Sequence, residues 1–484
     1  MFVKQRYFTN IAPDNIYEAL LSLNCPFVRS GKELYLVGGC VRDMVLGRTP
    51  KDYDLCTNLT PDEVKALLSK QTYYDRDLAQ DVRLYDFIDT GVKHGTITVY
   101  DRERAVSFEV TTYRQDGDYH DGRHPDSVTF VRSLEEDLKR RDFTINSLAY
   151  DLHGHKLYAL DESFLRDFEY GVIRTVGNPE DRFEEDALRM LRAIRFAAQL
   201  GFTISRDTYA AIKKYAQNLS LISKERIRDE VTKILLSDRP DMLKLFVLAG
   251  LEKPAFGFEP LGDMMRCEHE NPWHYADVFH HTMDVVNAVP KTFELRWAAL
   301  LHDAGKPTVK TLKEGTVDYY NYIGHPEVSA EIASRLMDTL KFSNEQKDVV
   351  YKFVKYHDTH LAEAKNSKFK SMVAEIGKDR FMDFIKLRSA DSFAHRLLMD
   401  TKFAVDFIDI VKERFAKIVL EDQALTLHDL KVNGYDIMAL GLSGKDIGAC
   451  LSHLLEAVLD ESCENEHDAL IEEAKAWAGG LRNE

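Results

Sequence analysis

Hydrophobic and polar positions divide the chain into an amino-terminal part with strand patterns and a longer part with helical patterns. Between residues 34 and about 150 there are short apolar runs, and the alternating runs 95–100 and 106–111 predict a β-hairpin. Beyond about residue 155 the strand signals fade. A 3.6-residue apolar stripe there indicates helices, with its members Ala187, Leu188, Leu191, Ile194 and Ala198. We therefore predict an α+β fold, in which a small mixed sheet precedes helical domains.

The chain of 484 residues is too long for one ordinary core, so three or four domains are expected. Pro254 and the glycines between 257 and 262 indicate a linker, and a second linker is predicted between residues 420 and 434. The predicted domains are a head over 1–155, a helical neck over 156–252, a body over 253–420 and a helical tail over 421–484.

Two local signals refine the head. Pro13-Asp14 predicts the start of a helix. The polar segment 73–89 interrupts the sheet pattern and is predicted to be a mobile loop.

The composition, with 44% apolar and 30% charged residues, is that of a soluble globular protein. No apolar run reaches eighteen residues, so no membrane span is expected. The first six residues lack the apolar core of a signal peptide. The six cysteines are widely spaced without a Cys-x-x-Cys pair, which indicates thiols in a reducing cytoplasm rather than disulfides or a zinc site.

The segment 34–55 carries the most specific chemistry. Gly38 and Gly39 end an apolar run and predict a strand that leads into a helix, where backbone N–H groups can approach a phosphate and Arg42 can add a forked donor. Asp52 and Asp54 are two apart in an expected strand, so both carboxylates leave one face and can hold a hard cation such as Mg²⁺ beside a nucleoside triphosphate. Each feature alone is typical of a turn or a solvated pair. Together they indicate nucleotidyl transfer.

This stretch closely resembles the nucleotidyltransferase core of the class II bacterial CCA-adding enzymes and their poly(A) polymerase relatives. Further segments resemble the later motifs of that family in the same order, namely residues 140–146, 171–177, 185–189 and 225–230. The resemblance implies addition of CCA to tRNA without a nucleic-acid template, in which the tRNA 3′-hydroxyl attacks the α-phosphate of CTP or ATP.

The resemblance also implies roles for single residues. Asp52 and Asp54 would bind the catalytic Mg²⁺, and Glu109, central on a neighbouring strand, is the candidate third carboxylate. The motif that contacts ribose and triphosphate is matched by Arg141, Asp142 and Asn146. The alternatives are a surface glutamate in the strand and a charged helix start in the second motif.

Glu185, Asp186 and Arg189 match the base-selecting motif. Asp186 and Arg189 are expected to share one face of a helix. Such a carboxylate accepts from the exocyclic amine of cytosine or adenine and faces an acceptor in uracil or guanine, so the pair can pass CTP and ATP and reject UTP and GTP. The alternative is a salt bridge within the helix.

A second set of residues resembles the HD-domain metal phosphohydrolases, whose ligands lie on separate helices. The matching residues are His281, His302, Asp303 and Asp391, with His325 and His357 as further candidates. Imidazole ligands favour Ni²⁺, Co²⁺ or Mn²⁺ over Mg²⁺. The substrates implied are phosphate esters such as a 2′,3′-cyclic phosphate on damaged tRNA. The alternative is that the HD segment is only a scaffold.

The net charge of −16 argues against a nucleic-acid partner if it is taken globally, but phosphate contacts require only a local positive surface. The candidates are Arg189, Arg192 and Arg195, Lys213-Lys214, and the lysines between 365 and 370. A monomer or homodimer is expected. Alternative functions are a poly(A) polymerase, an enzyme that adds only CC or only A, a protein that is mainly an HD phosphohydrolase, and a non-catalytic RNA-binding regulator.

Overall fold

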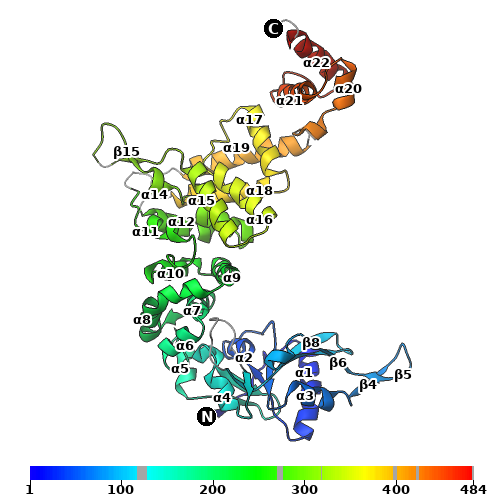
Figure 1. Cartoon of the computed structure of the whole chain (residues 1–484), viewed down its shortest axis with the longest axis vertical. Coiled ribbons are helices and arrows are strands. Elements are labelled where there is room, and N and C mark those ends of the chain that lie inside the picture. Colours follow the sequence, from blue (N-terminus) through cyan, green and yellow to red (C-terminus); the bar gives the residue numbers. More distant parts are fainter. Residues whose placement is uncertain (117–127, 270–275, 318, 396–400, 421–424, 482–484) are drawn as a thin grey trace. The chain divides into compact units, whose positions relative to one another are not determined.

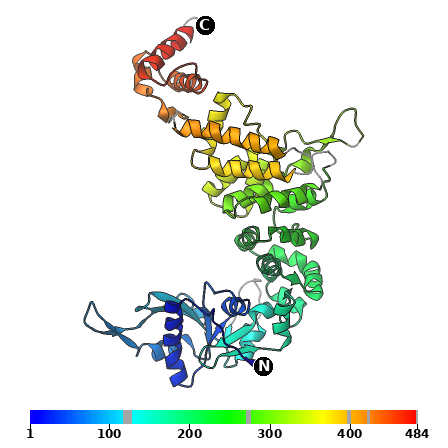
Figure 2. The ribbon, with the colours of Figure 1, turned by 180° about the vertical axis from the view of Figure 1, so that it is seen from behind.

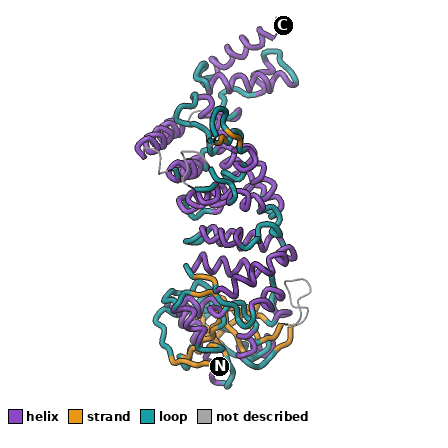
Figure 3. The backbone as a smooth tube through the Cα atoms, turned by 90° about the vertical axis from the view of Figure 1, so that its left-hand side faces the viewer, coloured by secondary structure: helices purple, strands orange, loops and turns teal. Residues whose placement is uncertain are grey.

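The computed structural model describes residues 1–116, 128–269, 276–317, 319–395, 401–420 and 425–481. The chain divides into two compact units, and each is described by itself. Unit 1 comprises Met1–Ile234 and Met242–Ala255, and unit 2 comprises Leu235–Asp241 and Phe256–Glu484. Figure 3 shows that most strands lie near the amino terminus and that helices dominate the rest, as predicted for an α+β fold.

Unit 1 begins with an eight-stranded sheet in the order β1-β12-β11-β2-β3-β8-β7-β6. Strands β3 and β8 are parallel and the other neighbours are antiparallel, so the sheet is mixed. The strands are β1 (Phe2–Gln5), β2 (Leu34–Val37), β3 (Asp54–Thr57), β6 (Tyr85–Ile88), β7 (Thr96–Asp101), β8 (Val106–Thr112), β11 (Leu148–Asp151) and β12 (Lys156–Ala159). The predicted hairpin is the pair β7–β8.

Alternation along the strands gives the sheet two apolar faces. One face packs under α1 (Asp14–Arg29), α2 (Gly39–Val45) and α3 (Pro61–Leu68) in a cluster that contains Leu36, Leu55, Phe108 and Val110. The other face packs against α4 (Leu134–Lys139) through Val37 and Cys56. Asp54 and Glu109 alternate with the residues of the first cluster, so their side chains belong to the α4 face.

Three predictions about the head are corrected. Segment 73–89 is not a loop, since it forms β4 (Thr72–Asp75) and β5 (Gln80–Arg83), a hairpin that projects beyond the sheet, and then β6 (Figures 1 and 2). Its polar pattern arises because the hairpin is largely exposed. Asp52 lies in a bend just before β3 rather than in a strand. The sheet continues past residue 155, because β12 pairs with both β1 and β11.

Helices follow the sheet in unit 1, joined by a two-residue parallel bridge between β13 (Val172–Ile173) and β14 (Thr203–Ile204). The predicted apolar stripe forms the buried side of α7, and Ala187 precedes it. The helices are α5 (Ser163–Glu169), α6 (Pro179–Glu185), α7 (Leu188–Leu200), α8 (Arg206–Tyr215), α9 (Lys224–Leu235) and α10 (Lys244–Leu248).

Unit 2 contains a helical body with one short hairpin, β15 (Thr311–Leu312) and β16 (Tyr320–Asn321). The predicted linker at 257–262 is partly helical, because α11 begins at Glu259. The body helices are α11 (Glu259–Met265), α12 (Val278–Ala288), α13 (Phe293–Leu301), α14 (Lys306–Val309), α15 (His325–Thr339), α16 (Asn344–Tyr356), α17 (Asn366–Ile376), α18 (Phe381–Ala394) and α19 (Thr401–Leu420).

A small cluster of its own holds the tail helices together, with Ile437, Cys450, Leu454 and Leu470 fully buried in it. The tail helices are α20 (Gly434–Ala439), α21 (Lys445–Leu459) and α22 (His467–Leu481). Part of the predicted linker 420–434, residues 421–424, lies outside the described residues. None of the helices in the described part of the chain has the length and apolar composition that crossing a membrane requires.

Candidate active site

Two carboxylates lie side by side on the α4 face of the sheet. Asp54, the first residue of β3, is the register partner of Glu109 on β8. Partial burial raises the pKa of Asp54, as do the negative charges of Glu109 and Asp52, whereas Arg141 lowers it. Asp52, Asp54 and Glu109 are therefore close enough to act on one another electrostatically. Such a donor set, made only of carboxylate oxygens, fits a hard divalent cation.

Gly38 stands between β2 and α2 in a backbone conformation that other residues rarely adopt, with φ of 72°. A β-carbon at this position would lie 3.1 Å from Arg141 Nη1 and 3.9 Å from Asp54 Oδ2. The glycine therefore lets the backbone, the guanidinium and the carboxylate meet at close range. Arg42, on the first turn of α2, donates to Asn146 Oδ1 at 3.1 Å and pairs with Asp43 at 2.8 Å.

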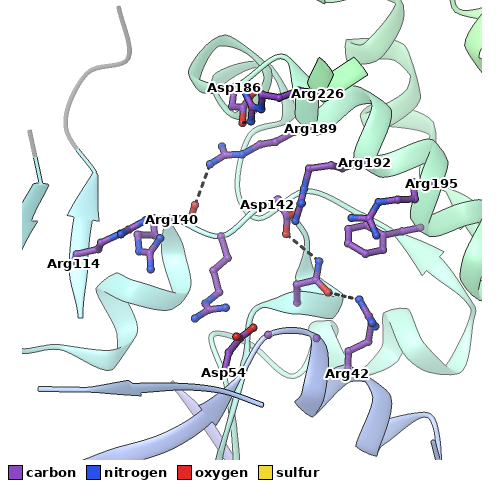
Figure 4. A pocket seen from close by; sticks show the side chains of 15 residues that line it. Arg42, Asp54, Arg114, Arg140, Asp142, Asp186, Arg189, Arg192, Arg195 and Arg226 are labelled. Atoms are coloured by element: carbon purple, nitrogen blue, oxygen red, sulfur yellow. Dashed lines mark hydrogen bonds and ion pairs between the residues drawn. The ribbon is translucent and has the colours of Figure 1, made fainter. Parts of the chain in front are cut away.

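A cavity of about 460 Å³ opens beside these residues (Figure 4). Among the residues that the structure describes, eight arginines and only three acidic residues line its wall. The arginines are Arg42, Arg114, Arg140, Arg141, Arg189, Arg192, Arg195 and Arg226, and the acidic residues are Asp54, Asp142 and Asp186. An enclosure with this excess of guanidinium groups suits a polyanion such as a triphosphate.

Asp142 is buried and is the centre of a hydrogen-bond network. One oxygen accepts from the Asn146 side chain at 3.1 Å, and the other accepts from Arg192 Nε at 2.8 Å and Nη2 at 2.5 Å. Burial raises the pKa of this carboxyl, but Arg192 and Asn146 outweigh it and lower the pKa to about 2. The charged carboxylate therefore fixes Arg192 and, through Asn146, Arg42.

Arg141 is held in the same way by Asp137 at the end of α4, with 3.1 Å between Arg141 Nη2 and Asp137 Oδ2. Asp137 is fully buried and also binds Arg140 at 2.7 Å. One buried carboxylate thus orients two cavity arginines. Asp137 was not among the residues predicted from the sequence. Its position four residues before Arg141 on a helix would have been the available signal.

The base-selecting motif is arranged differently from the prediction. Asp186 ends α6, and Arg189 lies in the first turn of α7, so the two residues do not share one helix. They do not form the alternative salt bridge either, because Asp186 pairs with Arg226 at 2.8 Å and Arg189 pairs with Glu185. Asp186 and Arg189 both line the cavity, whereas Glu185 lies behind Arg189 as its partner.

Six residues that line the cavity were missing from the predicted site, namely Arg114, Arg140, Arg192, Arg195, Phe196 and Arg226. Arg192 and Arg195 continue the three-residue spacing from Arg189, which the sequence analysis considered only as an RNA surface. Arg195 is fixed by Glu230 at 2.6 Å and lies 4.0 Å from the ring of Phe196. Arg226 belongs to the segment 225–230, which resembled the fifth motif, but its ion pair with Asp186 was not predicted.

A second cluster lies in unit 2, where every predicted HD residue converges. His281 on α12 has Nε2 3.1 Å from Asp391 Oδ1 on α18. His302, directly after α13, has Nε2 3.2 Å from Asp303 Oδ2 and 3.6 Å from Asp391 Oδ1. His325 and His357 approach the other oxygen of Asp303 at 3.3 and 3.5 Å. All six side chains are buried.

Backbone carbonyls set the orientation of three imidazoles. The Nδ1 atoms of His302, His325 and His357 donate to the carbonyls of Ala299, Tyr322 and Val354 at 2.7 to 2.8 Å. Because a carbonyl only accepts, the Nε2 atoms of the neutral rings carry lone pairs. The Nε2 atoms of His325 and His357 are 3.1 Å apart. Lone pairs that face one another and a carboxylate fit a bound cation, and the groups His281–His302–Asp391 and His302–Asp303–His357 have suitable spacing.

A proton is the alternative occupant of this cluster. Burial lowers the pKa of His302, yet Asp303 and Asp391 raise it to about 10. For Asp303, burial raises the pKa, but His302 and Lys306 lower it well below its ordinary value, so the carboxylate remains charged. A cavity of about 510 Å³ reaches the cluster, lined by Asp303, His325, His357 and Asp391 together with Tyr319, Tyr320 and Tyr322.

Three segments of the chain match models of known protein families. Residues 34–174 match the "Poly A polymerase head domain", residues 201–256 the "Probable RNA and SrmB- binding site of polymerase A", and residues 323–474 tRNA nucleotidyltransferase domain 2. The CCA-adding enzyme of Geobacillus thermodenitrificans is 42% identical over 280 residues, which are 57% of this chain and 60% of the relative. Over these segments the chain is similar to the CCA-adding enzymes.

The matched segments span about half the length of the curated relatives. The CCA-adding enzyme of Leuconostoc mesenteroides is 48% identical over 210 residues, 43% of this chain and 47% of the relative. Among CCA-adding enzymes of known structure, that of Bacillus stearothermophilus in complex with CTP is similar with a TM-score of 0.71 and 27% identity, over 97% of this chain and 99% of that one. That of Thermotoga maritima complexed with tRNA shares the fold, with a TM-score of 0.54, 19% identity and coverage of 99% and 100%.

Proposed function

We propose that the chain adds CCA to the 3′ end of tRNA, using CTP and ATP and no nucleic-acid template. The observation that carries this proposal is the cavity in which Asp54, the register partner of Glu109, faces a wall of arginines. In the reaction the 3′-hydroxyl of tRNA attacks the α-phosphorus of the nucleotide, and pyrophosphate leaves. The relatives named CCA-adding enzymes and the similar structure with CTP support the substrates.

Asp52, Asp54 and Glu109 would hold Mg²⁺, since they form a set of hard oxygen donors. Burial and then the charges of Glu109 and Asp52 raise the pKa of Asp54. When bound, the ion would supply neutralisation of the charge that develops on the phosphates. The chain's own contribution is the arginine wall. Arg42 and Arg192 are fixed through Asn146 and Asp142, so they receive the triphosphate without reorganisation.

Base choice would depend on the two cavity residues Asp186 and Arg189. The Asp186 carboxylate accepts from the exocyclic amine of cytosine or adenine, and the Arg189 guanidinium donates to ring acceptors. Uracil and guanine would place an oxygen acceptor against the carboxylate, which is also an acceptor, so no hydrogen bond forms and the two oxygens repel each other. Arg226 and Glu185 fix the two side chains from behind, so that selection is built into the folded unit.

The test is incubation of purified protein with tRNAs that lack CCA, CA or A, each with single nucleotides. CMP added to the first two and AMP only to the third is the expected result. Unlimited AMP addition would indicate a poly(A) polymerase, and addition of CC or A alone would indicate a partial enzyme. The segment 201–256 and tRNA form the expected interface. A cytoplasmic location is also proposed, since all six cysteines are free thiols.

We propose a second activity, metal-dependent phosphohydrolysis, from the convergence of His281, His302, Asp303 and Asp391. His325 and His357 would extend the ligand set, because their Nε2 lone pairs face the same carboxylate. Imidazole-rich sites favour Ni²⁺, Co²⁺ or Mn²⁺, and such an ion would supply Lewis-acid activation of water at neutral pH. The adjoining cavity gives a phosphate ester access.

Hydrolysis of a 2′,3′-cyclic nucleotide in the presence of each ion, together with metal analysis of the purified protein, tests this activity. Turnover that requires one of these metals is the expected result. If the protein bound none of these ions and showed no turnover with any of them, the cluster would have only a structural role, with a proton on His302.

A further inference from the structure

A third cavity lies in unit 1 apart from the arginine-lined one and shares no lining residue with it. It measures about 460 Å³, within the range of roughly 300–1,000 Å³ typical of small-ligand sites. Its walls come from β14, α8 and the segment that leads into α10. The apolar lining residues used below are Phe202, Ile204, Tyr209, Met242 and Leu245. The two aromatic rings are half-buried, so each keeps a face that a planar group can cover.

The cations of this cavity are arranged differently from those of the active site. Arg206, Lys213 and Lys244 line it, and no carboxylate does. Within the described residues none of these three has an ion-pair partner, whereas the active-site arginines are tied to buried acids. Lys213 Nζ instead lies 4.9 Å from the centre of the Tyr209 ring. In a chain with net charge −16, an apolar slot with three uncompensated cations is complementary to an anionic aromatic ligand.

We propose that this slot binds an unpaired nucleotide of the RNA substrate, with the base against Tyr209 and the flanking phosphates on Arg206, Lys213 and Lys244. The inference rests on the proposed function for its ligand, and it adds a contact site remote from the reacting atoms. Aromatic walls with a cationic rim are the general means by which proteins hold single-stranded RNA with little base preference. An acidic peptide would satisfy the cations but would leave the aromatic faces without a planar partner.

The chain supplies a matched control. Lys214 is the next residue on α8 and is also exposed, but it pairs with Glu180 at 2.7 Å and does not line the slot. Binding of fluorescent tRNA lacking CCA, and of a single-stranded RNA pentamer, is measured by anisotropy over a range of salt concentrations with the full chain. The variants are Lys213→Ala, the triple alanine variant at all three cations, Tyr209→Ala, Tyr209→Phe and Lys214→Ala.

The expected result is about tenfold weaker binding by the triple variant, with a salt slope reduced by about 2, since each single-strand phosphate contact contributes about 0.7. Tyr209→Ala should also lose about tenfold, and Tyr209→Phe should restore binding because it keeps the ring. In nucleotide addition the KM for tRNA should rise, while the kcat and the KM for CTP stay unchanged. Lys214→Ala should match the wild type throughout.

If the triple variant kept the wild-type salt slope and the wild-type KM for tRNA, the proposal that this slot binds RNA would be wrong, even if the wild type adds CCA. If the wild type added no nucleotides, the proposed CCA addition would be wrong. RNA binding by the slot would remain testable, because binding is measured separately. If a glutamate-rich peptide lost binding in the triple variant while both RNAs did not, the slot would belong to a protein partner and the proposal would be wrong. Circular dichroism melting of each variant excludes unfolding as the cause of a loss.

Discussion

The arginine-lined cavity of unit 1 and the histidine–aspartate cluster of unit 2 have opposite electrostatic character. In the first, an excess of permanent cations surrounds open space, and buried acids such as Asp137 and Asp142 fix the guanidinium groups from behind. In the second, lone pairs and carboxylates converge on one another within a buried core. The first arrangement receives an anion from solvent, and the second is complete only with a cation or a proton at its centre.

This difference predicts how each site responds to loss of one group. In the cavity, Asp54, Asp142 and Asp186 are three different acids with different partners. Substitutions there should therefore affect the rate, the stability or the base selectivity separately. In the cluster, Asp303 contacts four histidines and Lys306, so one substitution should remove the site as a whole.

The largest effect is expected from Asp54→Ala. The substitution removes the central member of the carboxylate set, and loss of several kcal/mol of transition-state stabilisation corresponds to at least about a thousandfold loss in CMP addition. Single-turnover incorporation of CTP into tRNA lacking CCA measures it. Asp86→Ala, on β6 of the same sheet and paired with Arg102 at the surface, is the control that should remain active. Near-normal addition by Asp54→Ala would exclude the site.

The comparison between sites is tested by Asp303→Ala. It should abolish metal-dependent phosphohydrolysis and reduce the bound transition metal to background, while CMP addition stays within about twofold because Asp54 and Glu109 are untouched. Metal analysis and both assays on one preparation check this. Asp338→Ala, an exposed α15 residue paired with Lys347, should change neither activity. A fall of both activities together would show that the two sites do not function separately.

A smaller and more selective effect is expected from Arg226→Ala. Arg226 fixes Asp186 without being the proposed contact to the base, so its loss should weaken discrimination against UTP and GTP by about tenfold, the cost of one charge-assisted hydrogen bond. Incorporation of all four nucleotides measures it. Arg228→Ala, on the same helix and paired with Asp229, should retain the wild-type preference. A uniform slowing with unchanged preference would argue against a positioning role.

The last prediction concerns the pH dependence of stability, where no change in the reaction is measured. The pKa of Asp142 in the folded protein, about 2, lies below its ordinary value near 3.8, so its contribution is present above pH 4 and is lost as the pH falls toward 2. Asp142→Asn should therefore remove about 2 kcal/mol of acid-dependent stabilisation of unit 1. Hydrogen exchange of β11 as a function of pH measures this. An acid response identical to that of the wild type would mean that Arg192 does not stabilise the charged carboxylate.

The sequence alone determined the parts of this protein that depend on local spacing. Alternation predicted the β7–β8 hairpin, and the helical period predicted the buried side of α7. The cluster of unit 2 was predicted from the resemblance of its ordered His and Asp residues to the HD-domain phosphohydrolases. Segment 73–89 was mistaken for a loop because an exposed hairpin lacks the apolar alternation that marks a half-buried strand.

Only the tertiary structure decided which charges meet. Asp142 and Arg192 are 50 residues apart in the sequence, and Arg42 and Asn146 are 104 apart. Asp186 pairs with Arg226 on another helix rather than with Arg189 on the next turn. The parallel pairing of β3 and β8 placed Glu109 beside Asp54, a register that the spacing of neither strand contains. Local patterns reflect backbone periods, whereas ion pairs form between any groups that folding brings within a few ångströms, so the chemistry of the cavity became visible only in three dimensions.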